Sequence, residues 1–197
     1  LNRKGLALIL RGDRVSAKEC LGAAIAKADG IKDVTTIAVS QVLLAWSAVQ
    51  DDDIVSAQTI HAPAAAYFSD RDHWVITYTN DEWQLNTWAI ESALVSAEIA
   101  YRTGDGRARD YLADAIDAAE RAFSPAHVCK AVVFAANLLS GSQPNLAAQL
   151  AAAVSEDSRA YFNDREWARS ILARLNPPDE AFASVEVASL AARQALL

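Results

Sequence analysis

The sequence predicts an all-α fold, arranged as a multi-helix bundle or a helical-repeat-like array of about eight helices. Alanine is by far the commonest residue, and the 7 Gly and 5 Pro stand where helices would begin or end. Polar side chains recur every three or four positions along two segments, as expected for helices with one wet face: Gln84, Thr87, Glu91, Glu98 and Arg102 in the first, and Asp110, Asp114, Asp117 and Arg121 in the second. A length of 197 residues predicts a single domain spanning 1–197.

The N-terminal half contains four predicted helices. Ser16 to Glu19 reads as a capping box and Gly30 as a stop, which gives a helix over 17–29. Asp33 caps an uncharged segment that runs to about 49 and is expected to be a buried central helix. Asp51 is expected to cap a third helix to about 68, and Asn80 opens a fourth that ends at Gly104. The β-branched and aromatic segment 74–78 is compatible with a short strand.

The C-terminal half contains a second apolar helix. Ser124 and Pro125 are a cap and a first-turn proline, and the helix that they open runs to Gly141 with few polar side chains. The segments 164–175 and 179–195 form a terminal helix pair, because no helix continues easily through Asn176-Pro177-Pro178.

Two sequence offsets raise the possibility of an internal duplication. Residues 66–72 (AYFSDRD) match residues 160–166 (AYFNDRE) at an offset of 94, and the same offset relates the two uncharged helices. Leu21 and Ile25 pair with Leu112 and Ile116 at an offset of 91. The hypothesis is a duplication with units at about 16–80 and 108–175, and the alternative is chance similarity between alanine-rich segments.

Composition excludes several classes of function. With 18 Lys and Arg against 25 Asp and Glu, the net charge of −7 argues against a nucleic-acid partner, because such binding depends on basic side chains that neutralise phosphates. The uncharged run 34–50 contains several hydroxyl and amide side chains and falls short of a membrane span, so no membrane association is expected. Two isolated cysteines fit no disulfide framework or zinc site, and no export signal is visible, which together indicate a cytoplasmic protein.

No residue pattern identifies a catalytic, cofactor or metal site. Phosphate-binding loops, the nucleophile elbow and Glu-x-x-His pairs do not occur. His61 has no acidic or thiol neighbour within a helical turn, and His127 lies in the first turn of an apolar helix, so both are expected to form capping or core hydrogen bonds. The run Asp51-Asp52-Asp53 could bind magnesium, although a helix N-cap explains it more simply. No cofactor is expected.

Acidic and aromatic residues are concentrated in the middle of the chain. Residues 33–100 contain one basic and ten acidic side chains, whereas 1–32 has a net charge of +4. Four of the five tryptophans also lie in 33–100. Aromatic anchors among carboxylates suit a basic protein partner, since the rings bury area and the charges steer the encounter. The candidate interaction surface comprises Asp70, Asp72, His73, Trp74, Tyr78, Asp81, Glu82, Trp83 and Trp88.

Two functions follow from this cluster. The first is a non-catalytic module of bacterial type that binds a basic protein, as an immunity or inhibitor protein does. The alternative is a small-molecule-binding or hydrolytic enzyme with an aromatic pocket around His73, in which His73 and Asp70 or Asp72 act as acid and base. A purely structural interpretation is that the tryptophans are core residues and the acids form a solvated face. Homo-oligomerisation stays open.

Overall fold

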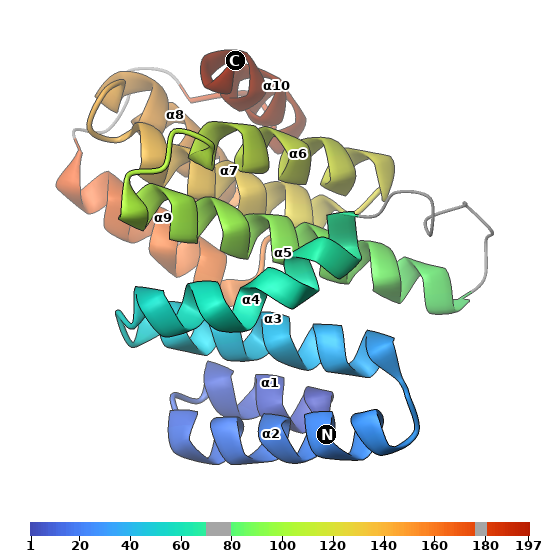
Figure 1. The fold of residues 1–197 in the computed structure, drawn as a ribbon. Helices are drawn as coiled ribbons and strands as arrows, with labels where there is room; N and C mark the ends of the chain where they lie inside the picture. The colour runs from blue at the N-terminus through green and yellow to red at the C-terminus, as the bar shows by residue number, and fades with distance from the viewer. Residues whose placement is uncertain (70–79, 176–180) are drawn as a thin grey trace. The chain divides into compact units, whose positions relative to one another are not determined.

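The regular structure of the chain is helical. The structure, a computed structural model, describes the backbone of residues 1–69, 80–175 and 181–197, and the side chains of these residues except 80–86. The predicted all-α class is confirmed, and the described residues form these helices: α1 Asn2–Leu10, α2 Arg14–Gly30, α3 Val34–Gln50, α4 Ile54–Ser69, α5 Asn80–Thr103, α6 Ala108–Arg121, α7 Pro125–Leu139, α8 Pro144–Glu156, α9 Phe162–Arg174 and α10 Val185–Leu196 (Figure 1).

The helices divide between two compact units. Unit 1 is Leu1–Asp105 and contains α1 to α5, and unit 2 is Gly106–Leu197 and contains α6 to α10. The described helices outnumber the eight expected because α1 and α8 were not anticipated. Whether the units together make the single domain predicted over 1–197, with repeat units at 16–80 and 108–175, stays a prediction. The expected strand 74–78 lies outside the described residues.

Unit 1 is built in chain order around α3. Each helix from α1 to α5 packs on the next one, and α3 also packs on α1 and α5 (Figure 1). Because other helices cover most of its sides, α3 has no charged residue and buries nine of its 17 positions, among them Val42, Leu43 and Val49. The apolar segment expected to be a central helix therefore lies in the core, as predicted.

Unit 2 is built around α7. This helix packs on α6, α8, α9 and α10, and ten of its 15 residues are buried. α6 contributes one apolar face, with Leu112, Ala115 and Ile116 fully buried, and turns its charged residues away from α7.

Three connectors in unit 1 repeat at intervals of 20 residues. Gly12, Lys32 and Asp52 have positive φ angles of 79°, 60° and 60°, and an aspartate follows each of them. The amides of these aspartates donate to Leu8 O, Ala28 O and Ala48 O, which closes each preceding helix with a Schellman motif. The carboxylates then accept from the amides of Ser16, Thr36 and Ser56 and cap the next helix.

This repeated connector corrects three predicted helix boundaries. Asp13, and not Ser16, caps α2; Asp53, and not Asp51, caps α4; and Lys32, and not Gly30, adopts the left-handed conformation after α2. Each of these aspartates is the third and last residue of its connector, so its carboxylate lies directly before the helix that it caps. The expected capping box began three residues too late for that geometry.

Helices α2 and α6 bury equivalent positions when they are aligned at an offset of 91 residues. α2 buries Ala17, Leu21, Ala24 and Ala28, and α6 buries Ala108, Leu112, Ala115 and Ala119. The following caps, Asp33 and Ser124, keep this offset. In contrast, the segments matched at an offset of 94 occupy different elements, because 66–69 ends α4 whereas 160–163 spans the start of α9.

Candidate interaction site

The predicted interaction surface falls mainly where side chains are not described. Asp70, Asp72, His73, Trp74 and Tyr78 lie outside the described residues. The backbone of Asp81, Glu82 and Trp83 belongs to the first turn of α5. Acidic residues at such a position interact favourably with the helix dipole. Whether these side chains meet on one surface stays a prediction.

Trp88 is the member of the surface whose side chain is described. It is partly buried and packs against the core cluster of unit 1, which includes Val95 and Phe68. This ring therefore contributes to the packing of α5 on the rest of the unit.

The aspartate run 51–53 is occupied by structural contacts. Asp51 forms ion pairs with Arg14 and, at 3.0 Å, with Lys18, whose hydrogen bond lowers the pKa of the Asp51 carboxyl. Asp52 lies 2.9 Å from Arg102 Nη1, and Asp53 caps α4. Each carboxylate has a different partner on a different element, so the run does not form a cation site. Within the described ranges, no three His, Cys, Asp or Glu side chains could hold a metal ion.

Two further acids of the middle segment also have structural partners. The Asp33 carboxylate accepts from the amide of Thr36 at 3.0 Å and from its hydroxyl at 2.6 Å, and these bonds lower the pKa of Asp33. Glu98 is buried on α5 and accepts from Arg102 Nε at 2.7 Å. Arg102 also donates to Val49 O at the end of α3, so the pair ties α5 to the connector between α3 and α4.

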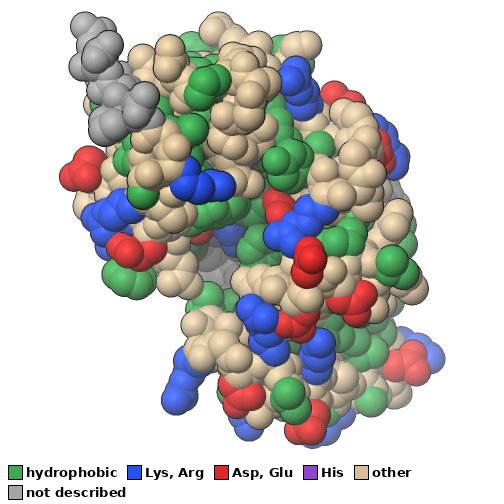
Figure 2. Space-filling view, turned by 90° about the vertical axis from the view of Figure 1, so that its left-hand side faces the viewer, with side chains coloured by type: hydrophobic (Ala, Val, Ile, Leu, Met, Phe, Trp, Pro, Cys, Tyr) green, Lys and Arg blue, Asp and Glu red, His purple; other side chains and the backbone are tan. Residues whose placement is uncertain are grey.

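The acids of residues 33–100 therefore fall into two groups. Asp33, Asp51, Asp52, Asp53 and Glu98 serve the fold of unit 1. Except for Glu91, which also takes part in an interaction, the remaining acids are Asp70, Asp72, Asp81 and Glu82 of the predicted surface. On the face shown in Figure 2, acidic and basic side chains lie interspersed, and no single sign of charge covers it. The side chains of these four acids, which lie between 70 and 82 in the sequence, are outside the described part of the chain.

His61 and His127 form buried hydrogen bonds with serines, as predicted for core and cap histidines. His61 Nε2 of α4 lies 3.0 Å from Ser92 Oγ of α5, and burial lowers the pKa of His61 to about 4. His127 Nδ1 lies 2.7 Å from the Oγ of Ser124, the N-cap residue of α7. A serine and a histidine at this distance could in principle act as nucleophile and base, but Ser92 and His61 are only 3% exposed and a substrate cannot reach them.

The thiol of Cys129 is buried. Both cysteines are free, and burial raises the pKa of the Cys129 thiol to about 12, so this thiol stays protonated and a poor nucleophile at neutral pH. Sequence reasoning identified the histidines as structural but not their serine partners. Ser92 lies 31 residues from His61, and no local spacing signals such a contact.

Comparison of the chain with protein-family models, with curated proteins and with solved structures finds no match. Among the described residues, no helix is long and apolar enough to cross a bilayer.

Proposed function

We propose that the chain is a non-catalytic module that binds a basic protein through the acidic and aromatic residues between Asp70 and Trp88. One observation carries this proposal. Five of the ten acids in residues 33–100 have contacts within unit 1, and four of the other five, whose side chains the structure does not describe, lie between 70 and 82 in the sequence together with Trp74, Tyr78 and Trp83. Carboxylates gathered in one stretch of the chain can steer a basic partner, and aromatic rings supply the buried area that holds it.

The arrangement of the helices supports a binding role. In unit 1, each helix packs on the next one along the chain and three connectors repeat every 20 residues, a regularity that helical arrays also show. Such arrays present extended surfaces and commonly act by binding other macromolecules. An inhibitor or immunity protein needs such a surface and no catalytic group of its own.

We also infer that the two units arose by internal duplication. The support is the common offset of 91 between the buried positions of α2 and α6, together with a central helix in each unit, α3 or α7, that packs on the other four helices. The two halves would then share an ancestral core, whereas the acidic and aromatic segment after α4 would belong to the first half alone.

Site-specific photo-crosslinking tests the binding proposal. A benzophenone amino acid replaces Trp83 in one variant and, as a control, Tyr111 on α6 in another, and both are irradiated in the cells that make the protein. We expect a discrete adduct from position 83 that disappears when Asp70, Asp72, Asp81 and Glu82 are changed to lysine. Position 111 should not give the same adduct. If both positions give the same products, or position 83 gives none, the proposal is wrong.

A further inference from the structure

The sequence contains two Asp-Gly pairs, Asp29-Gly30 and Asp105-Gly106. An aspartate that precedes a glycine can cyclise, because the amide nitrogen of the glycine attacks the side-chain carboxyl carbon and a water molecule is lost. Glycine favours this reaction, since it has no Cβ that would obstruct the attack. The reaction needs a glycine amide that is not bonded within a helix and a backbone that can bring this amide to the carboxyl group. The two pairs differ in both respects.

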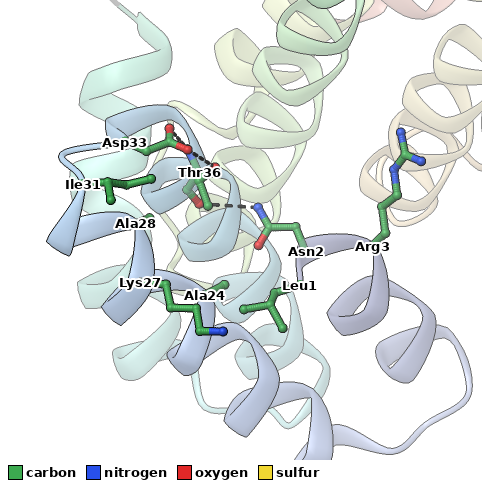
Figure 3. A pocket seen from close by; sticks show the side chains of 9 residues that line it. All are labelled: Leu1, Asn2, Arg3, Ala24, Lys27, Ala28, Ile31, Asp33 and Thr36. Carbon is green, nitrogen blue, oxygen red and sulfur yellow. Dashed lines mark hydrogen bonds between the residues drawn. The ribbon is translucent and has the colours of Figure 1, made fainter.

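The first pair, Asp29-Gly30, lies inside the closed end of α2. Gly30 is the last residue of this helix, so its amide donates within the helix. The amides of Ile31 and Asp33 both donate to Ala28 O, at 3.2 and 2.9 Å, and these bonds enclose the pair. Figure 3 shows Ala28 and Ile31, the residues on either side of the pair, where α2 ends beside a pocket. The backbone at 29–30 is therefore held in its helical conformation.

The second pair, Asp105-Gly106, follows the hydrogen bond that closes α5. The amide of Asp105 donates to Ala100 O at 2.8 Å, and cyclisation leaves this bond in place because the amide nitrogen of Asp105 takes no part in the ring. The next helix, α6, begins only at Ala108, and the Gly106 amide donates no hydrogen bond within the described part of the chain. The attacking amide is therefore held by neither helix.

The surroundings of Gly106 leave room for the reaction. Gly106 is exposed, and a Cβ built on it would meet nothing within 4 Å. Solvent can therefore reach the ring that forms, and no neighbouring group blocks the movement of the glycine toward the carboxyl group. Exposed connectors also make few contacts that oppose a change of the backbone.

We propose that Asp105 is a site of spontaneous isomerisation to isoaspartate, whereas α2 protects Asp29 from the same reaction. The Gly106 nitrogen bonds to Asp105 Cγ and loses its proton, a hydroxyl leaves the carboxyl group, and the two depart as water. A water molecule then adds to the backbone carbonyl of the ring and breaks its bond to the nitrogen, which regains a proton. The product has the original composition, but the backbone that joins unit 1 to unit 2 is one carbon longer. This inference does not depend on the function proposed above.

Peptide mapping of the full chain in water enriched in oxygen-18 tests this proposal. The folded chain is incubated at neutral pH and then digested with trypsin in ordinary water, which releases residues 103–107 and 28–32 as two short peptides. Each isomerisation introduces one oxygen-18 atom, and chromatography separates an isoaspartyl peptide from its aspartyl form. We expect labelled isoaspartate to accumulate severalfold faster in 103–107 than in 28–32.

A matched variant and a matched condition identify the cause. Gly106→Ala places a Cβ in open space, so it should keep the circular dichroism spectrum and slow the reaction at Asp105 severalfold. Incubation in concentrated guanidinium chloride should remove the difference between the two sites, because α2 no longer holds Gly30.

Three results would overturn the proposal. The first is no labelled isoaspartate at Asp105 in the folded chain, or a rate there no higher than at Asp29. The second is an unchanged rate in Gly106→Ala. The third is a faster reaction at Asp105 that persists to the same degree in the unfolded chain, because the neighbouring residues in the sequence, and not the helix, would then set the difference.

Discussion

His61 Nε2 lies 3.0 Å from Ser92 Oγ, and this contact joins α4 to α5 in the interior of unit 1. Because the ring is 3% exposed and burial disfavours its charged form, the folded chain holds His61 neutral, with a pKa lowered from 6.5 to about 4. Protonation therefore competes with folding at this position.

This contact predicts that unit 1 loses stability in mild acid. A histidine whose pKa is lowered on folding contributes stability that is fully present above pH 6.5 and is lost as the pH falls toward 4. Between pH 7 and pH 5 the free energy of unfolding should fall by about 2 kcal/mol through this group. Urea unfolding at the two pH values measures the loss, and His61→Gln should reduce it. A pH dependence that His61→Gln leaves unchanged would assign the effect to other groups.

The repeated connector predicts equal costs for three substitutions. Asp13→Ala, Asp33→Ala and Asp53→Ala each remove a carboxylate that caps a helix, so each should lower the free energy of unfolding by about 1 kcal/mol. Glu19→Ala, on the exposed face of α2, is the control and should change it by less than about 0.5 kcal/mol. Thermal unfolding compares the four variants, and losses no larger than that of the control would show that these carboxylates do not stabilise the connectors.

The left-handed backbone conformation of Lys32 predicts that its substitution by glycine stabilises the chain. This residue adopts a φ of 60°, a conformation that costs a side-chain-bearing residue about 1 kcal/mol and costs glycine nothing in strain. Lys32→Gly should therefore raise the free energy of unfolding by about 0.5–1 kcal/mol. Lys27→Gly, in the interior of α2, should lower it by about 1 kcal/mol. Chemical denaturation of the two variants tests this prediction, because the free energy of unfolding is expected to rise in Lys32→Gly and to fall in Lys27→Gly.

Substitution by alanine is predicted to change the stability in opposite directions at Gly5 and at Gly22. A Cβ at Gly5 would lie 2.5 Å from Leu21 Cδ2, so α1 could not keep its close approach to α2. Gly5→Ala should cost about 1–3 kcal/mol. A Cβ at Gly22 meets nothing within 4 Å, and Gly22→Ala should stabilise the helix by about 0.5–1 kcal/mol. Stabilisation by both changes, measured as melting temperatures, would contradict the packing of α1 on α2.

The sequence predicted the fold class and the central helices because these depend on local patterns. The uncharged segments 34–49 and 126–139 could be stable only with most sides covered, and both are central helices. The short helix α1 was not predicted because its residues 2–10 begin without a cap or a polar stripe. Asp13, Asp33 and Asp53 mark the 20-residue connector repeat in the sequence, but three aspartates at equal spacing do not by themselves show that each one caps a helix.

From the sequence, the interaction site could be predicted only as a stretch that is rich in acidic and aromatic residues. Which acids serve the fold depends on contacts between residues far apart in the chain, such as Asp52 with Arg102 and Asp51 with Arg14, and no sequence spacing reveals these pairs. Counting charges along the chain therefore overstated the acidity available to a partner around 33–53 and 98. The acids of the segment 70–82 lie outside the described side chains, so the predicted surface there stays a prediction.

The salt dependence of association with the crosslinked partner tests the binding proposal most directly. Stopped-flow measurement of the association rate should show it falling as salt increases. The variant with lysine at Asp70, Asp72, Asp81 and Glu82 should associate severalfold more slowly than the wild-type chain. A control with lysine at the exposed Glu19, Asp29, Asp110 and Glu156 has the same net charge and should retain most of the wild-type rate. An unchanged rate in the first variant, or an equal loss in the control, would contradict a binding surface at 70–82.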